Sequence, residues 1–207
     1  LKTPLTNMHL LLETVKQPDN SLEEFHSYLD KQEKQLTKID FLIQALLKTS
    51  QLENGMIRIR KKETSIGQTI LAALEVVLVQ AEKKEIEVYY DNTTDYVVSH
   101  DSKWTVEALL NVMENAVKYT PRNGRITIWL GKTEKYVKIS VKDTGIGILR
   151  ADMPHIFKRF WRGNTNIWEG SGIGLYLCKQ IIELQYGYIL VNSIVGLGSE
   201  FEIFLPL

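Results

Sequence analysis

The sequence predicts an α+β fold in two parts, an N-terminal helical hairpin followed by a two-layer α/β domain with a mixed sheet. Three observations lead to this prediction. The N-terminal part has apolar residues at spacings of three and four, which is typical of helices. From Ile66 onward, helical patterns alternate with short runs rich in β-branched and aromatic residues. The segments GKTEK and VGLGS between such runs look like hairpin turns, which favours antiparallel neighbours over a doubly wound parallel sheet.

The hairpin is predicted from two apolar heptad patterns, one over residues 5–15 and one over residues 22–46. The intervening segment QPDNS contains a helix-ending proline and two residue types that cap a following helix. Two helices with apolar seams cannot enclose a core alone. We therefore expect residues 1–52 to form a four-helix bundle with a second copy, or else to pack on the globular part of the same chain.

The second part is expected to cover residues 53–207, with the boundary near Leu52. Hydrophobic periodicity predicts helices at residues 66–84, 103–119 and 173–186. Strands are predicted at residues 86–90, 96–99, 125–130, 136–142, 188–192 and 200–205.

Composition and charge narrow the functional classes. Lys plus Arg number 25 and Asp plus Glu number 25, so the chain lacks the positive field that drives nonspecific nucleic-acid binding. The single cysteine, Cys178, cannot form an intramolecular disulfide, and no Cys/His spacing suits zinc, which fits a reducing compartment. The longest apolar run, residues 70–81, is interrupted by Glu75 and Gln80 and is too short to cross a bilayer. We therefore expect a soluble chain that does not bind nucleic acid.

Glycine is concentrated in one segment. Of the 13 glycines in the chain, six lie within thirty residues: Gly145, Gly147, Gly163, Gly170, Gly172 and Gly174. This density indicates close approach of the backbone to a ligand. The segment GSGIGL opens an apolar helix, so its amides and the positive end of the helix could hold a phosphate, although tight packing alone would also explain it.

Two polar features accompany the glycines. Asp143 follows the strand-like run YVKISVK, and a carboxylate that only accepts hydrogen bonds suits an exocyclic amine such as that of adenine. A plain turn-initiating aspartate is the alternative. On the helix NVMENAVKYTP, the side chains of Asn111, Asn115 and Lys118 share a face. Amide oxygens suit Mg²⁺ and lysine suits phosphate, so this face indicates a metal-bound polyphosphate, with a solvated polar face as the alternative.

Four segments, in order along the chain, resemble the N, G1, F and G2 boxes of the catalytic ATP-binding domain of sensor histidine kinases: NVMENAVKYTP, DTGIGI, FKRFWRG and GSGIGLYLCKQII. The segment LKTPL resembles the H box of the dimerisation and phosphotransfer hairpin of that family, so the resemblance covers essentially the whole chain. The wider superfamily of DNA gyrase, Hsp90 and MutL shares the N and glycine boxes but lacks the other two elements. The implied fold of residues 53–207 is the two-layer sandwich of Bergerat (GHKL ATPase) type.

The resemblance implies roles for individual residues. Asn115 is expected to bind Mg²⁺ with the assistance of Asn111, and Lys118 to contact phosphate. Asp143 is expected to recognise adenine. A lid is expected over residues 161–171. The further residues implied for the ATP site are Tyr119, Gly145, Gly147, Gly170, Gly172, Gly174 and Leu175.

The resemblance also implies a function, that of the cytoplasmic catalytic portion of a sensor histidine kinase that uses Mg-ATP. In the family, the acceptor histidine lies four residues before the threonine of KTP, which here is Thr3. The acceptor is therefore expected just upstream of Leu1, and the chain as given is not expected to autophosphorylate. None of the histidines in the chain occupies the acceptor position. Thr3 is expected to position the water that dephosphorylates a response regulator.

The implied partners are a response regulator and a second copy of the chain, with contact through residues 1–52. The chain itself is expected on the cytoplasmic side of the cell membrane, and any membrane anchor is expected in a segment outside this chain. A nucleotide-gated interaction module or an ATPase without phosphotransfer is the alternative function. The chemistry of the product distinguishes these possibilities.

Overall fold

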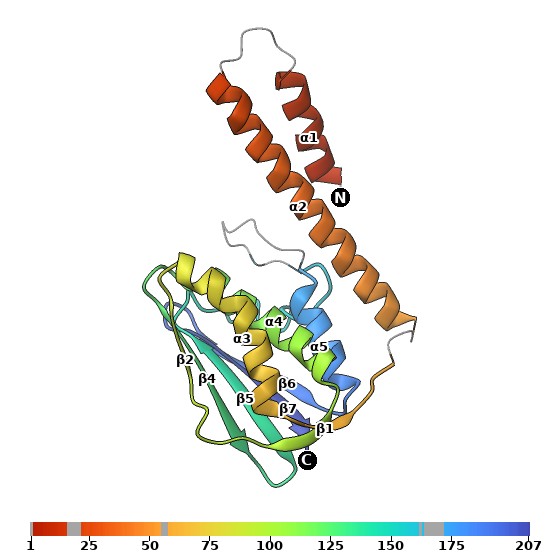
Figure 1. Cartoon of the computed structure of the whole chain (residues 1–207), viewed down its shortest axis with the longest axis vertical. Coiled ribbons are helices and arrows are strands. Elements are labelled where there is room, and N and C mark those ends of the chain that lie inside the picture. Colours follow the sequence, from red (N-terminus) through yellow and green to blue (C-terminus); the bar gives the residue numbers. More distant parts are fainter. Residues whose placement is uncertain (1, 16–21, 55–57, 162, 164–171) are drawn as a thin grey trace. The chain divides into compact units, whose positions relative to one another are not determined.

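The computed structural model describes residues 2–15, 22–54, 58–161, 163 and 172–207 (Figure 1). The chain divides into two compact units, Leu1–Glu53 and Asn54–Leu207. The first unit contains the helices α1 (Lys2–Val15) and α2 (Leu22–Glu53). The helices of the second unit are α3 (Ile66–Lys83), α4 (Ser102–Tyr119) and α5 (Gly174–Glu183). Its strands are β1 (Lys62–Ser65), β2 (Glu87–Tyr90), β3 (Val97–His100), β4 (Arg125–Lys132), β5 (Tyr136–Asp143), β6 (Tyr188–Ile194) and β7 (Gly198–Pro206).

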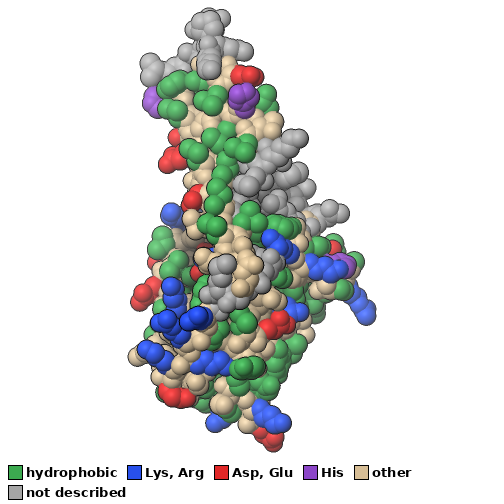
Figure 2. Space-filling model, turned by 90° about the vertical axis from the view of Figure 1, so that its right-hand side faces the viewer, with side chains coloured by type: hydrophobic (Ala, Val, Ile, Leu, Met, Phe, Trp, Pro, Cys, Tyr) green, Lys and Arg blue, Asp and Glu red, His purple; other side chains and the backbone are tan. Residues whose placement is uncertain are grey.

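In the first unit, α1 packs against α2. The Gln32 side-chain amide donates a hydrogen bond to the Met8 carbonyl oxygen at 2.9 Å, so this polar residue within the second heptad pattern faces the neighbouring helix. Other seam residues remain exposed, and Figure 2 shows hydrophobic side chains on the surface of these helices. The exposed apolar residues are Leu5, Leu10, Leu12, Phe25, Leu29, Leu36, Ile43 and Leu47. The hairpin of one chain therefore leaves an apolar surface uncovered.

The second unit is built on a five-stranded mixed sheet with the strand order β2-β4-β5-β7-β6. β2 and β4 are parallel, and every other neighbouring pair is antiparallel. The predicted hairpins β4–β5 and β6–β7 are therefore confirmed. The three helices cover one face of the sheet, which gives the predicted two layers (Figure 1). Fully buried residues between the layers include Ile70, Leu109, Ile139, Ile181 and Ile203.

The second unit also contains a two-stranded sheet, which the sequence did not predict. β1 was not predicted, and β3, expected over residues 96–99, pairs with β1 and not with the large sheet. The sequence of β1, KETS, has little strand character of its own, and it is extended because it pairs with β3 from Lys62 opposite His100 to Ser65 opposite Val97. Pairing at this separation along the chain is not visible in a local pattern.

The end of α5 also differs from the prediction of a helix over residues 173–186. The helix ends at Glu183, and Tyr186 adopts a left-handed backbone with φ 66°. The Gly187 amide donates to the Ile182 carbonyl at 3.0 Å, and the Tyr186 amide donates to the Glu183 carbonyl at 2.9 Å. These bonds form a Schellman motif, which usually places glycine where this chain has Tyr186.

The buried side chain of Gln185 joins the end of α5 to the start of α4. Its Oε1 accepts a hydrogen bond from the Asp101 amide at 2.7 Å, and its Nε2 donates to Thr105 Oγ1 at 3.1 Å. Asp101 in turn caps α4 by accepting from the Trp104 amide at 3.2 Å. Its second oxygen accepts from the Arg60 amide at 2.7 Å, on the segment before β1. The two helices with predicted ligand contacts are thus held by one buried polar network.

No helix in the described part of the chain is both long and apolar enough to cross a membrane.

Candidate functional site

The carboxylate of Asp143 lies at the end of β5 and is only 4% exposed. Its Oδ1 accepts hydrogen bonds from the Gly145 amide at 2.7 Å and the Ser199 amide at 3.2 Å. No described residue donates a hydrogen bond to Oδ2. One oxygen is therefore engaged by the fold, and the other is available to a donor from outside the protein.

Burial raises the pKa of Asp143 above its ordinary value of 3.8, although the hydrogen bonds from the Gly145 and Ser199 amides act in the opposite direction. The folded state therefore holds the carboxyl proton more tightly than the unfolded chain does. The stability that this group contributes is fully present below the unfolded pKa and is lost as pH rises through the raised folded pKa. A buried charge that costs stability above that pH is typical of a group retained for binding.

The glycines around Asp143 allow close contact between backbone segments. A Cβ atom on Gly147, which has φ 72°, would lie 2.2 Å from the Ile194 carbonyl oxygen. A Cβ on Gly145 would lie 2.6 Å from the Tyr119 carbonyl oxygen. These two predicted site residues thus bring the glycine turn, residues 143–147, against the end of α4 and the β6–β7 hairpin. Packing within the protein already requires glycine at both positions.

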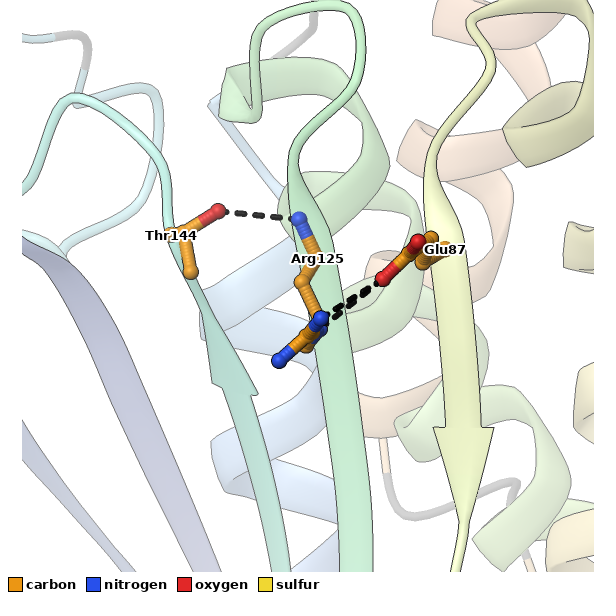
Figure 3. A network of polar contacts seen from close by, with 3 residues as sticks. All are labelled: Glu87, Arg125 and Thr144. Atoms are coloured by element: carbon orange, nitrogen blue, oxygen red, sulfur yellow. Dashed lines mark hydrogen bonds and ion pairs between the residues drawn. The ribbon is translucent and has the colours of Figure 1, made fainter.

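Thr144 ties the glycine turn to β4 (Figure 3). Its Oγ1 accepts a hydrogen bond from the Arg125 amide at 2.9 Å, and its own amide donates to the Arg125 carbonyl at 3.0 Å. The Arg125 guanidinium also pairs with Glu87 on β2 at 2.8 Å, but both side chains are largely exposed. This pair contributes at most about 1 kcal/mol, so the two hydrogen bonds between Thr144 and the Arg125 backbone hold the turn.

Ser193 on β6 holds Ile148, the residue that follows the glycine turn. Its Oγ accepts from the Ile148 amide at 2.8 Å and donates to the Gly198 carbonyl at 3.0 Å. The sequence patterns did not single out Ser193, Ser199 or Thr144. Ser199 is the last residue of the predicted VGLGS hairpin turn, and this position was the one signal that could have found it.

On α4, the side chain of Asn111 is directed toward the start of α5. Its Nδ2 donates to the Glu107 carbonyl at 2.8 Å, so its amide oxygen is left for other partners. A Cβ atom on Gly174 would lie 2.5 Å from this oxygen. Asn115, one turn further along α4, is half-buried. Asn111, one of the two predicted amides, therefore contacts the predicted phosphate-binding segment.

Lys118 and Tyr119 form the last turn of α4. The Lys118 ammonium donates to the Tyr119 hydroxyl at 3.1 Å and lies 4.6 Å from the centroid of that ring. Both side chains are half-buried. The structure thus brings a cation and an aromatic ring together beside the glycine turn, which the Tyr119 carbonyl contacts through the Ile146 amide at 3.3 Å.

α5 begins at Gly174, and its first turn includes the half-buried Leu175. Among the described residues, no side-chain capping hydrogen bond is made at this end of the helix. Gly172, just before it, has φ 69°, and a Cβ there would lie 2.5 Å from the Trp161 carbonyl oxygen. Amides at the start of a helix, together with the positive end of the helix dipole, suit an anion such as phosphate. Gly170 and most of the predicted lid, at residues 162 and 164–171, lie outside the described residues.

The donor groups in this region suit Mg²⁺ that is bound together with a polyphosphate. Among the described residues, no group of three or more His, Cys, Asp or Glu side chains could hold a metal. The amide oxygen of Asn111 instead lies at the start of α5, with Asn115 on the same helix face. Mg²⁺ prefers one or two protein oxygens completed by water and phosphate oxygens, so these residues fit the ion.

The remaining predicted residue, Thr3, lies in α1, and its side chain is outside the described part.

The structure shows the neighbours of two of the histidines. His9 is exposed, with Glu13 at 4.0 Å. His100 is buried, with its ring nitrogens 2.9 Å from Thr69 Oγ1 and 3.0 Å from the Val98 carbonyl.

Comparison with known proteins places this geometry in a family. Residues 100–207, which contain every predicted ATP-site residue, match the family model of the histidine kinase-, DNA gyrase B-, and HSP90-like ATPases. The adaptive-response sensory kinase SasA of Synechococcus sp. (strain JA-3-3Ab) is 34% identical over 212 residues, which cover 100% of this chain and 56% of the relative. The chain spans about half the length of the curated relatives it matches.

Solved structures agree with this result. The mycobacterial sensor histidine kinase MprB is 28% identical, with a TM-score of 0.62, over 71% of this chain and 97% of that chain. The histidine kinase ThkA, solved in complex with the response regulator protein TrrA, is 21% identical, with a TM-score of 0.81, over 99% of this chain and 58% of that chain. At this identity, the likeness shows a shared fold. The chain belongs to the histidine kinase-, DNA gyrase B-, and HSP90-like ATPase family, and it is homologous to sensor histidine kinases over its full length.

The contact between Gly174 and Asn111 gives a first prediction. In Gly174→Ala, the new methyl group displaces the flexible Asn111 amide, while alanine suits the first turn of a helix. We expect the melting temperature to change little and the affinity for Mg-ATP to fall about tenfold, equivalent to about 1.4 kcal/mol. Calorimetry and thermal unfolding measure the two quantities.

The matched control is Gly131→Ala in β4, where a new Cβ meets only the end of the Lys138 side chain at an ordinary contact distance of 3.6 Å. Its affinity for Mg-ATP should equal that of the unchanged chain. A Gly174→Ala variant that binds Mg-ATP as tightly as this control would contradict the placement of Asn111 at the nucleotide.

Proposed function

We propose that this chain is the catalytic portion of a sensor histidine kinase. It binds Mg-ATP, transfers the γ-phosphoryl group to a histidine, and passes that group to an aspartate of a response regulator. The observation that carries the proposal is the buried Asp143 carboxylate, with Oδ1 engaged by two backbone amides and Oδ2 without a donor among the described residues. Residues 53–207 are the catalytic domain in this proposal, and residues 1–52 are the dimerisation and phosphotransfer hairpin.

Base recognition follows from the chemistry of Asp143. A carboxylate oxygen accepts a hydrogen bond from the exocyclic amine of adenine. It repels the oxo group that guanine and hypoxanthine carry at the same ring position. The engaged Oδ1 fixes the orientation of the carboxylate through the Gly145 and Ser199 amides. Tyr119 offers an aromatic ring beside the base, on the turn of α4 that touches the glycine turn.

Phosphate binding is assigned to the ends of two helices. The amides at the start of α5, with Gly172, Gly174 and Leu175, would hold phosphate oxygens together with the Lys118 ammonium. Asn115 and Asn111 would supply amide oxygens to Mg²⁺, which neutralises charge on the polyphosphate during transfer. Exclusion of water by the lid, residues 161–171 with Gly170, would direct the phosphoryl group to the protein acceptor.

The acceptor is proposed to be a histidine four residues before Thr3, in the position that the H-box resemblance gives it. A neutral imidazole nitrogen there would attack the γ-phosphorus in line, forming a nitrogen–phosphorus bond as the bond to the ADP oxygen breaks. Thr3 would position a water molecule for dephosphorylation of the regulator. The complex of ThkA with TrrA supports a receiver protein as the partner, and the cytoplasmic side of the cell membrane as the location follows from the same family resemblance.

The hairpin is proposed to form a four-helix bundle with a second copy. The exposed residues Phe25, Leu29 and Leu36 of α2 continue at heptad spacing through Ile43, and they leave apolar area uncovered in one chain. Burial of this surface against an identical one is the lowest-cost way to remove it from water.

The kinase reaction is tested with γ-labelled Mg-ATP on two proteins, the chain as given and the same chain extended upstream through the proposed histidine. We expect acid-labile, base-stable label on the extended protein only. An Asn115→Ala variant of the extended protein should lose the label, because it lacks an amide oxygen for Mg²⁺.

An extended protein that binds nucleotide but takes no label would contradict the kinase proposal. Release of inorganic phosphate in that case would favour an ATPase. Binding without either product would favour a nucleotide-gated interaction module.

The bundle is tested by sedimentation equilibrium of the whole chain. Leu36→Glu places a charge in the apolar seam and should weaken dimerisation about a hundredfold or more, because a buried unpaired charge costs several kcal/mol. The control Gln44→Glu introduces the same residue at an exposed polar position of α2 and should leave the dimer intact. A monomeric unchanged chain, or equal dimerisation of both variants, would contradict the proposal.

A further inference from the structure

Lys84, which no sequence motif singled out, reaches from the end of α3 to the end of α4. It is the C-cap residue of α3 and is half-buried. Its ammonium donates hydrogen bonds to the carbonyl oxygens of Val117 at 2.7 Å, Lys118 at 3.0 Å and Thr120 at 2.9 Å. All three N–H donors of the ammonium are thus directed at one helix end.

The end of α4 has a specific need for such a donor. Carbonyl groups in the last turn of a helix have no intrahelical partner. The Thr120 amide satisfies the Ala116 carbonyl at 3.0 Å, but the next residue, Pro121, has no N–H to offer the Val117 carbonyl. Lys84 supplies the missing donor, and its positive charge lies at the negative end of the helix dipole.

The glycine turn also holds the last turn of α4. The Ile146 amide donates to the Tyr119 carbonyl at 3.3 Å, which is the one carbonyl between residues 117 and 120 that Lys84 does not contact. Lys84 and the glycine turn therefore divide the free carbonyls of α4 between them. Together they set how this turn is placed relative to Asp143.

We propose that Lys84 is a positioning residue for the nucleotide site. Its ammonium fixes the last turn of α4, and that turn presents the Lys118 ammonium and the Tyr119 ring to the nucleotide. Lys84 itself bonds to backbone carbonyls and acts through Lys118. The inference rests on the proposed function, because it assumes that this turn binds Mg-ATP.

The test compares binding of Mg-ATP to variants of the whole chain by calorimetry. Lys84→Met keeps the aliphatic stem and removes the three donors, and we expect it to weaken binding about tenfold or more. Lys84→Arg keeps the charge and donors and should bind within about threefold of the unchanged chain. The control Lys83→Met removes an exposed lysine from the same helix and should have no effect.

A double-variant cycle separates positioning from a purely structural role. If Lys84 acts through Lys118, then adding Lys84→Met to Lys118→Met should weaken binding by less than about threefold, because the two losses are not additive. Lys84→Gln replaces Lys84→Met if circular dichroism shows that the latter is unfolded at the assay temperature.

Three outcomes would overturn the inference: equal affinity in Lys84→Met and the unchanged chain, a full additional loss in the double variant, or failure of Lys84→Arg to restore binding. These outcomes differ from failure of the proposed function. In that case the unchanged chain itself would not bind Mg-ATP.

Discussion

The pair of hydrogen bonds from the Gly145 and Ser199 amides to one oxygen of Asp143 is the constraint on which the site depends. These bonds join the end of β5, the glycine turn and the start of β7 at a carboxylate that the fold buries. The approach is so close that a Cβ on Gly198, where φ is 104°, would lie 2.0 Å from the Asp143 carbonyl oxygen. Because both amides use the same oxygen, the carboxylate is oriented by the protein and still keeps acceptor capacity for a ligand.

The helix α4 links this carboxylate to the rest of the site. Its start is fixed by Asp101 and the buried Gln185 amide, and its end is fixed by Lys84 and the glycine turn. Between these ends, Asn111 contacts the start of α5. A helix held at both ends presents its amides and cation in one arrangement, and such preorganisation lowers the entropy cost of binding a flexible polyphosphate.

Much of this arrangement could be predicted, because it is encoded in local patterns. Periodicity gave α3 and α4 to within a residue or two, and the turn sequences gave the two hairpins of the large sheet. β1 was not predicted, because its extended conformation depends on pairing with β3 and its own sequence has no strand pattern. The end of α5 was misplaced because a tyrosine occupies the left-handed position at which glycine is the usual signal.

The supporting residues of the site could not be predicted for a related reason. Thr144, Ser193 and Lys84 act on backbone groups of other elements, and nothing in their own neighbourhood marks those contacts. The density of glycine drew attention to this segment, but the sequence could not separate ligand approach from packing. At Gly145 and Gly147 the structure shows packing against Tyr119 and Ile194, which is compatible with a nearby ligand.

The most direct test of the central claim, that Asp143 recognises an exocyclic amine, is calorimetry with ATP and inosine triphosphate, whose bases differ in carrying an amine or an oxo group at one position. The unchanged chain should bind ATP at least about tenfold more tightly, since a buried acceptor facing an oxo group is left unpaired. Asp143→Asn should remove this preference, and the ATP affinity of the unchanged chain should fall as pH is lowered through the raised pKa of Asp143. Equal affinity for the two nucleotides in the unchanged chain, or a preference that survives in Asp143→Asn, would contradict the claim.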